Sequence, residues 1–254
     1  MAPILVAMGR RERNEVAPLM RRLRPIATKH ALVRLGPLGD GGYLVPNDLA
    51  GIEACFSPGV GLIFGFESDC AALGMAIFMA DGSVERPAAL RDDFHFDQTN
   101  LGSGADGTIT LDRWVADSLP KSKSDLLLQM DIEGAEFDAL LNTTDATLDR
   151  FRIIAVELHE FQRLLDPVFR ERMAATLDKL LRNHVCVHVH PNNCCGSAQV
   201  AGVVVPCIAE FTFLRRDRLS RRWRKRFVRS FPNALDADNV PSNDYLPVPD
   251  VLIG

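Results

Sequence analysis

The apolar residues of this chain fall into short continuous runs that are separated by polar and glycine-rich segments. The clearest runs are residues 126–130 and 153–156, and both are followed by acidic or histidine residues. Between them, Phe137, Leu140 and Leu141 recur at the spacing of one helix face. The pattern predicts a buried strand, a sharp turn at residues 132–135, a helix and a second buried strand.

The same alternation extends along most of the chain, and it predicts a parallel α/β sheet with helices on both faces. A glycine-rich hairpin or loop is expected at residues 34–46, and a turn at residues 191–196. The other strands are expected at residues 53–57, 75–80, around Phe94, 185–189, 203–205 and 209–214, and the helices at residues 64–73, from 109 onward and at 167–183.

Three segments are expected along the chain. Residues 1–30 have helical spacing up to Pro25 and predict a cap or lid helix, and residues 31–215 form the α/β domain. Residues 216–254 are expected to be a basic segment and an extended tail. The basic run Arg215–Arg229 is interpreted either as a solvated helix or as a site for an anionic partner.

Charge and hydropathy narrow the classes of partner. The 254 residues carry a formal net charge of -4, which argues against a nucleic-acid partner. No apolar run approaches the roughly 20 residues that span a bilayer. The mildly apolar start is followed by arginines, which is the reverse of a signal peptide, so we expect a cytoplasmic protein.

The six cysteines do not form a recognisable metal or disulfide motif. No C-x-x-C pair occurs, and Cys194 and Cys195 are adjacent, which is poor geometry for an ordinary disulfide or a structural zinc site. We therefore expect reduced and mostly buried thiols.

Candidate chemistry lies at the ends of the predicted strands, where open α/β sheets bind ligands. Gly59 and Gly61 follow one strand and precede a helix, an arrangement that presents backbone N–H groups to a nucleotide-like ligand. This G-x-G alone is a weak signal. Asp81 ends the next strand, about 20 residues on, where an acid can hold ribose hydroxyls. A plain cap before Gly82 is the alternative for Asp81.

Acidic and histidine side chains at later strand ends suggest a metal site. Glu157 and His159 are two residues apart and share a strand face, and Asp131 ends the neighbouring run. With His190, these groups suit a divalent cation: magnesium or manganese for oxygen ligands, and manganese, iron or zinc once imidazoles take part. The alternative is that Glu157 and His159 pair with each other. Polar contacts to a substrate are expected from Asp40, Tyr43 and Asn193.

The residues around these strand ends resemble the FkbM-type methyltransferases, which are class I enzymes that use S-adenosylmethionine (SAM). The most specific segment is Asp131-Ile-Glu-Gly-Ala-Glu136 after a buried strand. The resemblance extends from about Arg34 to residues 236–239. The further matching segments are Asp40-Gly-Gly-Tyr43, Phe66-Glu67, Thr110-Leu-Asp-Arg-Trp114, His190-Pro-Asn-Asn193, Pro206 and Glu210-Phe-Thr212.

The resemblance implies a Rossmann-like sheet of seven strands, mostly parallel, whose last strand, residues 209–214, is antiparallel. It implies SAM over Gly59 and Gly61 with Asp81 on the ribose, and methyl transfer to a hydroxyl of a sugar, a glycan or a small natural product. The sequence departs from the family where Ser57 and Pro58 replace the usual acid before the first glycine, so Glu67 joins Asp81 as a candidate cofactor residue.

Three hypotheses follow. The first is a SAM-dependent O-methyltransferase in which His159, Asp131 and Glu157 activate the acceptor hydroxyl, with or without a divalent cation. The second is a metal-dependent hydrolase that uses the same three residues and His190. The third is a non-catalytic protein that retains the fold and binds an anionic partner through Arg215–Arg229.

Overall fold

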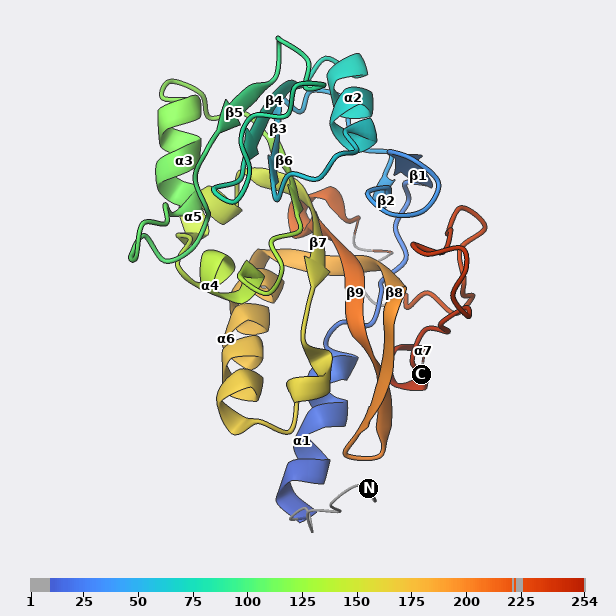
Figure 1. Cartoon of the computed structure of the whole chain (residues 1–254). Helices are drawn as coiled ribbons and strands as arrows, with labels where there is room; N and C mark the ends of the chain where they lie inside the picture. The colour runs from blue at the N-terminus through green and yellow to red at the C-terminus, as the bar shows by residue number, and fades with distance from the viewer. Residues whose placement is uncertain (1–9, 221, 223–225, 254) are drawn as a thin grey trace.

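The structure is a computed structural model that describes residues 10–220, 222 and 226–253, and its chain path is shown in Figure 1. The first half contains α1 (Arg10–Arg21), β1 (Leu32–Leu35), β2 (Tyr43–Pro46), β3 (Ala54–Pro58), α2 (Gly65–Ala72), β4 (Ala76–Ala80), β5 (His95–Asp97), α3 (Leu111–Ser118) and β6 (Leu126–Met130). The second half contains α4 (Glu136–Leu141), α5 (Asp145–Leu148), β7 (Phe151–Leu158), η1 (Phe161–Arg163), α6 (Pro167–Asn183), β8 (His184–Val200), β9 (Val203–Arg215), η2 (Arg216–Arg218) and α7 (Asp250–Ile253).

The sheet has seven strands in the order β5-β4-β3-β6-β7-β9-β8. The first five strands in this order, from β5 to β7, are parallel, and β9 pairs antiparallel with both β7 and β8. The expected α/β fold with a mostly parallel seven-stranded sheet is confirmed. Because β3 lies between β4 and β6, the turns that follow these three strands meet at one edge of the sheet.

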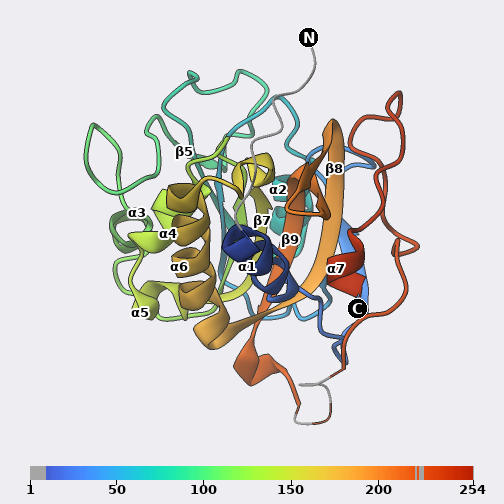
Figure 2. The ribbon, with the colours of Figure 1, turned by 90° about the horizontal axis from the view of Figure 1, so that it is seen from below.

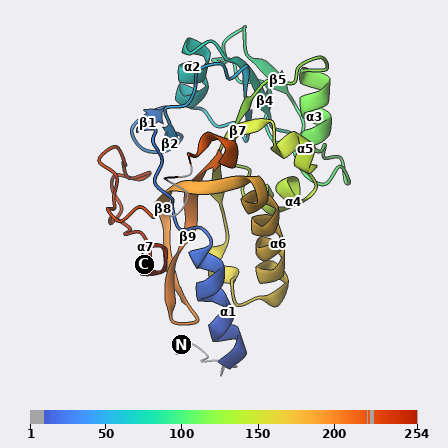
Figure 3. The same cartoon turned by 180° about the vertical axis from the view of Figure 1, so that it is seen from behind.

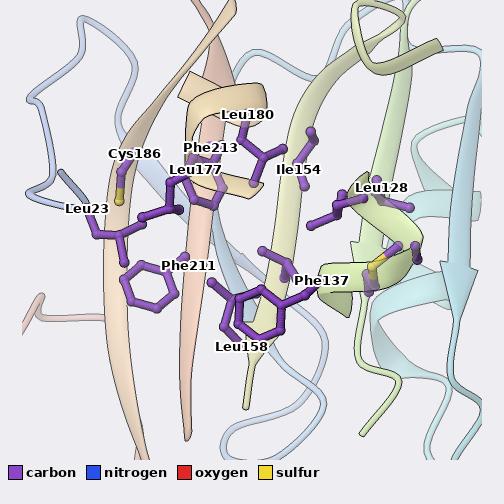
Figure 4. Close-up of a cluster of buried hydrophobic side chains, with 14 of the residues drawn as sticks. Leu23, Leu128, Phe137, Ile154, Leu158, Leu177, Leu180, Cys186, Phe211 and Phe213 are labelled. Atoms are coloured by element: carbon purple, nitrogen blue, oxygen red, sulfur yellow. The ribbon is translucent and has the colours of Figure 1, made fainter. Parts of the chain in front are cut away.

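Alternate residues of the central strands point to opposite faces of the sheet, and both faces are buried. On one face, Phe56, Leu128 and Ile154 pack with residues of α1, α3, α4 and α6. Figure 4 shows part of this cluster, in which Phe137 of α4 and Leu177 of α6 lie over the strands. Figure 2 shows α1, α4 and α6 grouped together on this face.

The opposite face is covered by α2 and by the β1–β2 hairpin. Its core contains Cys55 of β3, Leu127 of β6 and Ile153 of β7, with Tyr43 and Val45 from the hairpin. The hairpin lies beside α2 and the upper end of the sheet in Figures 1 and 3. This arrangement brings the hairpin loop, residues 36–42, to the carboxyl ends of the strands.

Both ends of the described chain pack into the same core. Leu19 of α1 and Leu23, just after this helix, belong to the cluster that contains the sheet residues, and so does Leu252 of α7. The N-terminal helix expected from the spacing of residues 16–23 therefore has no separate core of its own.

Two sequence predictions are wrong about the C-terminal half. The turn expected at residues 191–196 is part of β8, which continues to Val200 with an irregularity between Asn192 and Ser197. In the described part of the basic segment, only η2 is helical where a longer helix was one interpretation. Residues 221 and 223–225 of that segment lie outside the described residues. Its first arginines instead pair within the protein: Arg215 with Asp125, and Arg218 with Asp48.

None of the helices in the described part of the chain is both long and apolar enough to cross a membrane.

Candidate active site

A cavity of about 630 Å³ lies at the carboxyl ends of β3, β4 and β6. It joins residues that are far apart in sequence, because the order of strands in the sheet differs from their order in the chain. Its lining is formed by Asp40, Gly59, Val60, Gly61, Ala80, Asp81, Ser83, Asn100, Leu101, Thr108, Asp131, Ile132, Glu133 and Ala135.

The turn after β3 requires glycine at its first position. Gly59 has a φ of +90°, and a Cβ atom there would lie 1.6 Å from the carbonyl oxygen of Asp131. The turn after β3 and the turn after β6 are therefore in direct backbone contact. At Gly61, by contrast, a Cβ atom would meet nothing within 4 Å, because this position opens onto the cavity.

Asp81 is fixed by three donors. Its Oδ2 accepts a hydrogen bond from the backbone N–H of Val60 at 2.9 Å, and its Oδ1 accepts from the N–H and the hydroxyl of Ser83 at 2.7 and 2.6 Å. Burial opposes ionisation, but these donors outweigh it and lower the pKa of Asp81. The side chain is thus an oriented carboxylate at the cavity wall.

Glu67, the second candidate cofactor acid, does not line the cavity. It is buried behind the turn, 2.5 Å from the hydroxyl of Ser57, and that hydroxyl lies 2.5 Å from Oε1 of Gln129. Burial raises the pKa of Glu67, although the hydrogen bond with Ser57 opposes this shift. Glu67 and Ser57 therefore pack behind the glycine turn and do not line the cavity.

Asp131 and His159 meet at the ends of β6 and β7, as the sequence predicts. The Nε2 atom of His159 lies 3.8 Å from Oδ1 of Asp131, 3.6 Å from Oε1 of Glu157 and 3.5 Å from Oε2 of Glu133. Oδ1 of Asp131 is buried and has no hydrogen-bond partner. Among the described residues, the group of ligand atoms close enough to hold a metal ion is Asp131, Glu133 and His159.

Glu136 is a site residue that our sequence reasoning missed. It is fully buried, its Oε1 accepts hydrogen bonds from the N–H groups of Ile132 and Gly134, and the same oxygen lies 3.1 Å from Nδ1 of His159. This carboxylate links the turn after β6 to the imidazole and directs Nε2 toward the other acids. Its place in the Asp131–Glu136 segment was the available signal.

The acids around His159 have pKa values far from their usual range. Burial, together with the charge of nearby Asp131, raises the pKa of Glu157 to about 9, and burial raises that of Asp131 to about 7 although His159 opposes it. Burial lowers the pKa of His159, but the contact with Glu136 and the surrounding acids outweigh it and raise the value to about 9.

His190 is not brought to this group. The antiparallel strand β9 lies between β7 and β8, so Glu157 is opposite Glu210, and Glu210 is opposite His190. Two strand spacings amount to roughly 10 Å. The His190 ring instead contacts Asn239 at 3.2 Å and Asp236 at 3.8 Å. The four-residue metal set of the hydrolase hypothesis is therefore not assembled.

The three expected substrate residues lie in different settings. Asp40 is exposed in the hairpin loop and lines the cavity. Tyr43 is buried behind it and accepts a hydrogen bond from Gln129 at 3.2 Å. Asn193 is buried and binds the C-terminal segment, since its amide oxygen accepts from the N–H of Val240 and its amide nitrogen donates to the carbonyl of Val240.

The sheet is that of a Rossmann-like α/β protein, and the cavity lies at the strand ends, where such sheets bind ligands. Residues 82–185 match the family model of the methyltransferase FkbM domain, and this match confirms the resemblance seen in the sequence. The match contains Asp131, Glu133, Glu136 and His159, and it begins just after Asp81. A search of the curated proteins finds no match to this chain.

Proposed function

We propose that the protein is a SAM-dependent O-methyltransferase that acts on a hydroxyl of a sugar, a glycan or a small natural product. The observation that carries the proposal is the single cavity in which the glycine turn and Asp81 face Asp131 and Glu133. A methyl donor on one wall and an acceptor hydroxyl on the other would meet within it.

The residues after β3 and β4 fit the cofactor. The methyl group carried by the sulfonium of SAM supplies the electrophile, and the protein supplies alignment. Gly59 permits the tight turn and Gly61 leaves space for a ligand close to the backbone. The oriented carboxylate of Asp81 is placed to accept hydrogen bonds from ribose hydroxyls.

The residues after β6 and β7 fit an acceptor hydroxyl, which is a poor nucleophile until it is deprotonated. Asp131 has a pKa of about 7, close to neutral pH, which suits a general base, and its Oδ1 has no hydrogen-bond partner. His159, held by Glu136, carries a proton at neutral pH and offsets the negative charge of Asp131 when that group is ionised.

A divalent cation also fits this group. Asp131, Glu133 and His159 would hold it through two carboxylates and an imidazole, and it would lower the pKa of a coordinated hydroxyl. Glu133 has a φ of 56°, a strained conformation for a residue with a side chain, and such strain is common at ligand sites.

The test is calorimetric titration of the full chain with SAM, with and without a chelator. We expect binding in both conditions, because Gly59, Gly61 and Asp81 take no part in the candidate cation site. Loss of binding on chelation would show that the cation and SAM sites are coupled. The absence of SAM binding in either condition would refute the proposal.

A further inference from the structure

Cys194 and Cys195 are adjacent in sequence, yet their sulfur atoms lie 2.8 Å apart. Successive side chains of a regular strand point to opposite faces, so this contact requires an irregular strand. In β8, Asn192 pairs with Ile208 and Ser197 with Pro206, so residues 193–196 face the single residue 207 of β9. This bulge turns the two thiols toward each other.

The pair is also accessible. Cys194 and Cys195 are both exposed, whereas Cys55, Cys70 and Cys186 are buried. We propose that Cys194 and Cys195 form a redox-modifiable dithiol that exchanges with low-molecular-weight disulfides and closes to a disulfide between adjacent residues. The sequence argument that adjacency prevents ordinary pairing holds for a regular strand and not for this bulge.

The exchange proceeds in two balanced steps. The thiolate of one cysteine attacks a sulfur of the small disulfide, whose S–S bond breaks and releases one small thiol. The neighbouring cysteine then attacks the protein sulfur of the mixed disulfide, which releases the second small thiol and forms the Cys194–Cys195 bond. The protein loses two electrons and two protons, and the small disulfide gains them.

Either thiol can begin the exchange, because both are exposed and their sulfur atoms are in contact. The cysteine that does not attack the small disulfide then resolves the mixed disulfide.

The bulge is linked to the candidate active site by hydrogen bonds. The N–H of Cys194 donates to the amide oxygen of Asn192 at 2.9 Å, and Nδ2 of Asn192 donates to the carboxylate of Glu157 at 3.1 and 3.3 Å. The redox chemistry is independent of the proposed function, although any effect on turnover depends on it.

The test is incubation of the full chain with oxidised glutathione, followed by intact mass measurement, thiol counting in denaturant and peptide mapping. We expect the wild-type chain to lose two thiols and the mass of two hydrogens, to retain no glutathione and to show a Cys194–Cys195 bond. Dithiothreitol should restore both thiols. A stable glutathione adduct on the wild-type chain, a bond to Cys207 or no reaction would each overturn the proposal.

Single variants test whether both thiols are needed. Cys194→Ser should stop at a glutathione adduct on Cys195, and Cys195→Ser at an adduct on Cys194, because each variant lacks the resolving thiol. Cys207→Ser is the matched control: it removes a neighbouring thiol on β9 and should behave as the wild type. An internal disulfide in either Cys194→Ser or Cys195→Ser, or its loss in Cys207→Ser, would contradict the pairing of Cys194 with Cys195.

Discussion

The carboxylates of Asp81 and Asp131 occupy equivalent places in the fold and behave differently. Each follows a parallel strand, and the two strands, β4 and β6, flank β3. Asp81 accepts three hydrogen bonds and its pKa is lowered. Oδ1 of Asp131 has no hydrogen-bond partner, and burial raises its pKa to about 7. Strand order thus determines where an acid lies, and the local donors determine its charge.

This difference divides the cavity into two chemical regions. The first region, around Gly59 and Asp81, offers backbone donors and a fixed anion, which suit a cofactor that has hydroxyl groups. The second region, around Asp131 and His159, holds a carboxylate oxygen of Asp131 that lacks a hydrogen-bond donor, which suits proton transfer or a cation. Three predictions test this division.

The largest effect is expected where the two regions touch. Gly59→Ala should lower the free energy of unfolding by about 4 kcal/mol or more, because the new Cβ atom would overlap the carbonyl oxygen of Asp131 at a positive φ. Urea denaturation measures this change. Gly61→Ala is the matched control, and it should cost less than about 1 kcal/mol because its Cβ atom would enter open space. Equal losses in both variants would contradict the close contact.

A smaller effect is expected on the cofactor side. Asp81→Ala should weaken SAM binding by about tenfold to a hundredfold, the range for losing hydrogen bonds to a charged group. Calorimetric titration measures the change. Asp93→Ala removes an exposed acid that pairs with Arg91 and should leave SAM affinity unchanged. If Asp81→Ala bound SAM as tightly as the wild type, Asp81 would not contact the cofactor.

The smallest effect concerns pH and stability on the acceptor side. Glu157 and His159 both have raised pKa values of about 9, so the folded protein binds more protons than the unfolded chain at neutral pH. Their contribution to stability is complete at acidic pH and is lost as the pH rises through 9. The free energy of unfolding should fall by about 1 kcal/mol or more between pH 6 and pH 9.

Glu157→Gln should reduce this loss, because the variant has no carboxyl group to ionise. Asp81→Asn is the contrasting variant: the pKa of Asp81 is lowered, so its contribution is lost as the pH falls, and the alkaline side should not change. Urea denaturation across the pH range in the absence of SAM measures both. A wild-type stability that increased toward pH 9 would contradict the raised pKa values.

Local signals in the sequence predict a helix or a turn correctly where the tertiary contacts favour the same conformation. The helix expected at residues 167–183 has the observed bounds of α6, because Asp166 caps its first turn and Pro167 suits the first helical position. The turn expected at residues 191–196 fails for the opposite reason. Its proline, asparagines and glycine are turn residues, but pairing with β9 holds this segment in a bulged strand.

The candidate site could be predicted in part. Asp131 and His159 meet because their strands are neighbours in the sheet. His190 was misplaced because sequence order does not reveal that β9 lies between β7 and β8. The contact of Glu136 with the imidazole depends on the path of the turn after β6, which residue spacing alone does not specify.

The segment after β9 has a consequence for how the protein is made. Asn193 binds the backbone of Val240, and Asn239 donates to the buried carboxylate of Glu210. Asp236 lies 2.9 Å from the ring of His188. These partners are translated after the whole sheet, so a nascent chain that has emerged only as far as β9 exposes a row of unsatisfied polar groups. During synthesis, these polar groups of β8 and β9 are therefore paired only after the turns that line the cavity have been made.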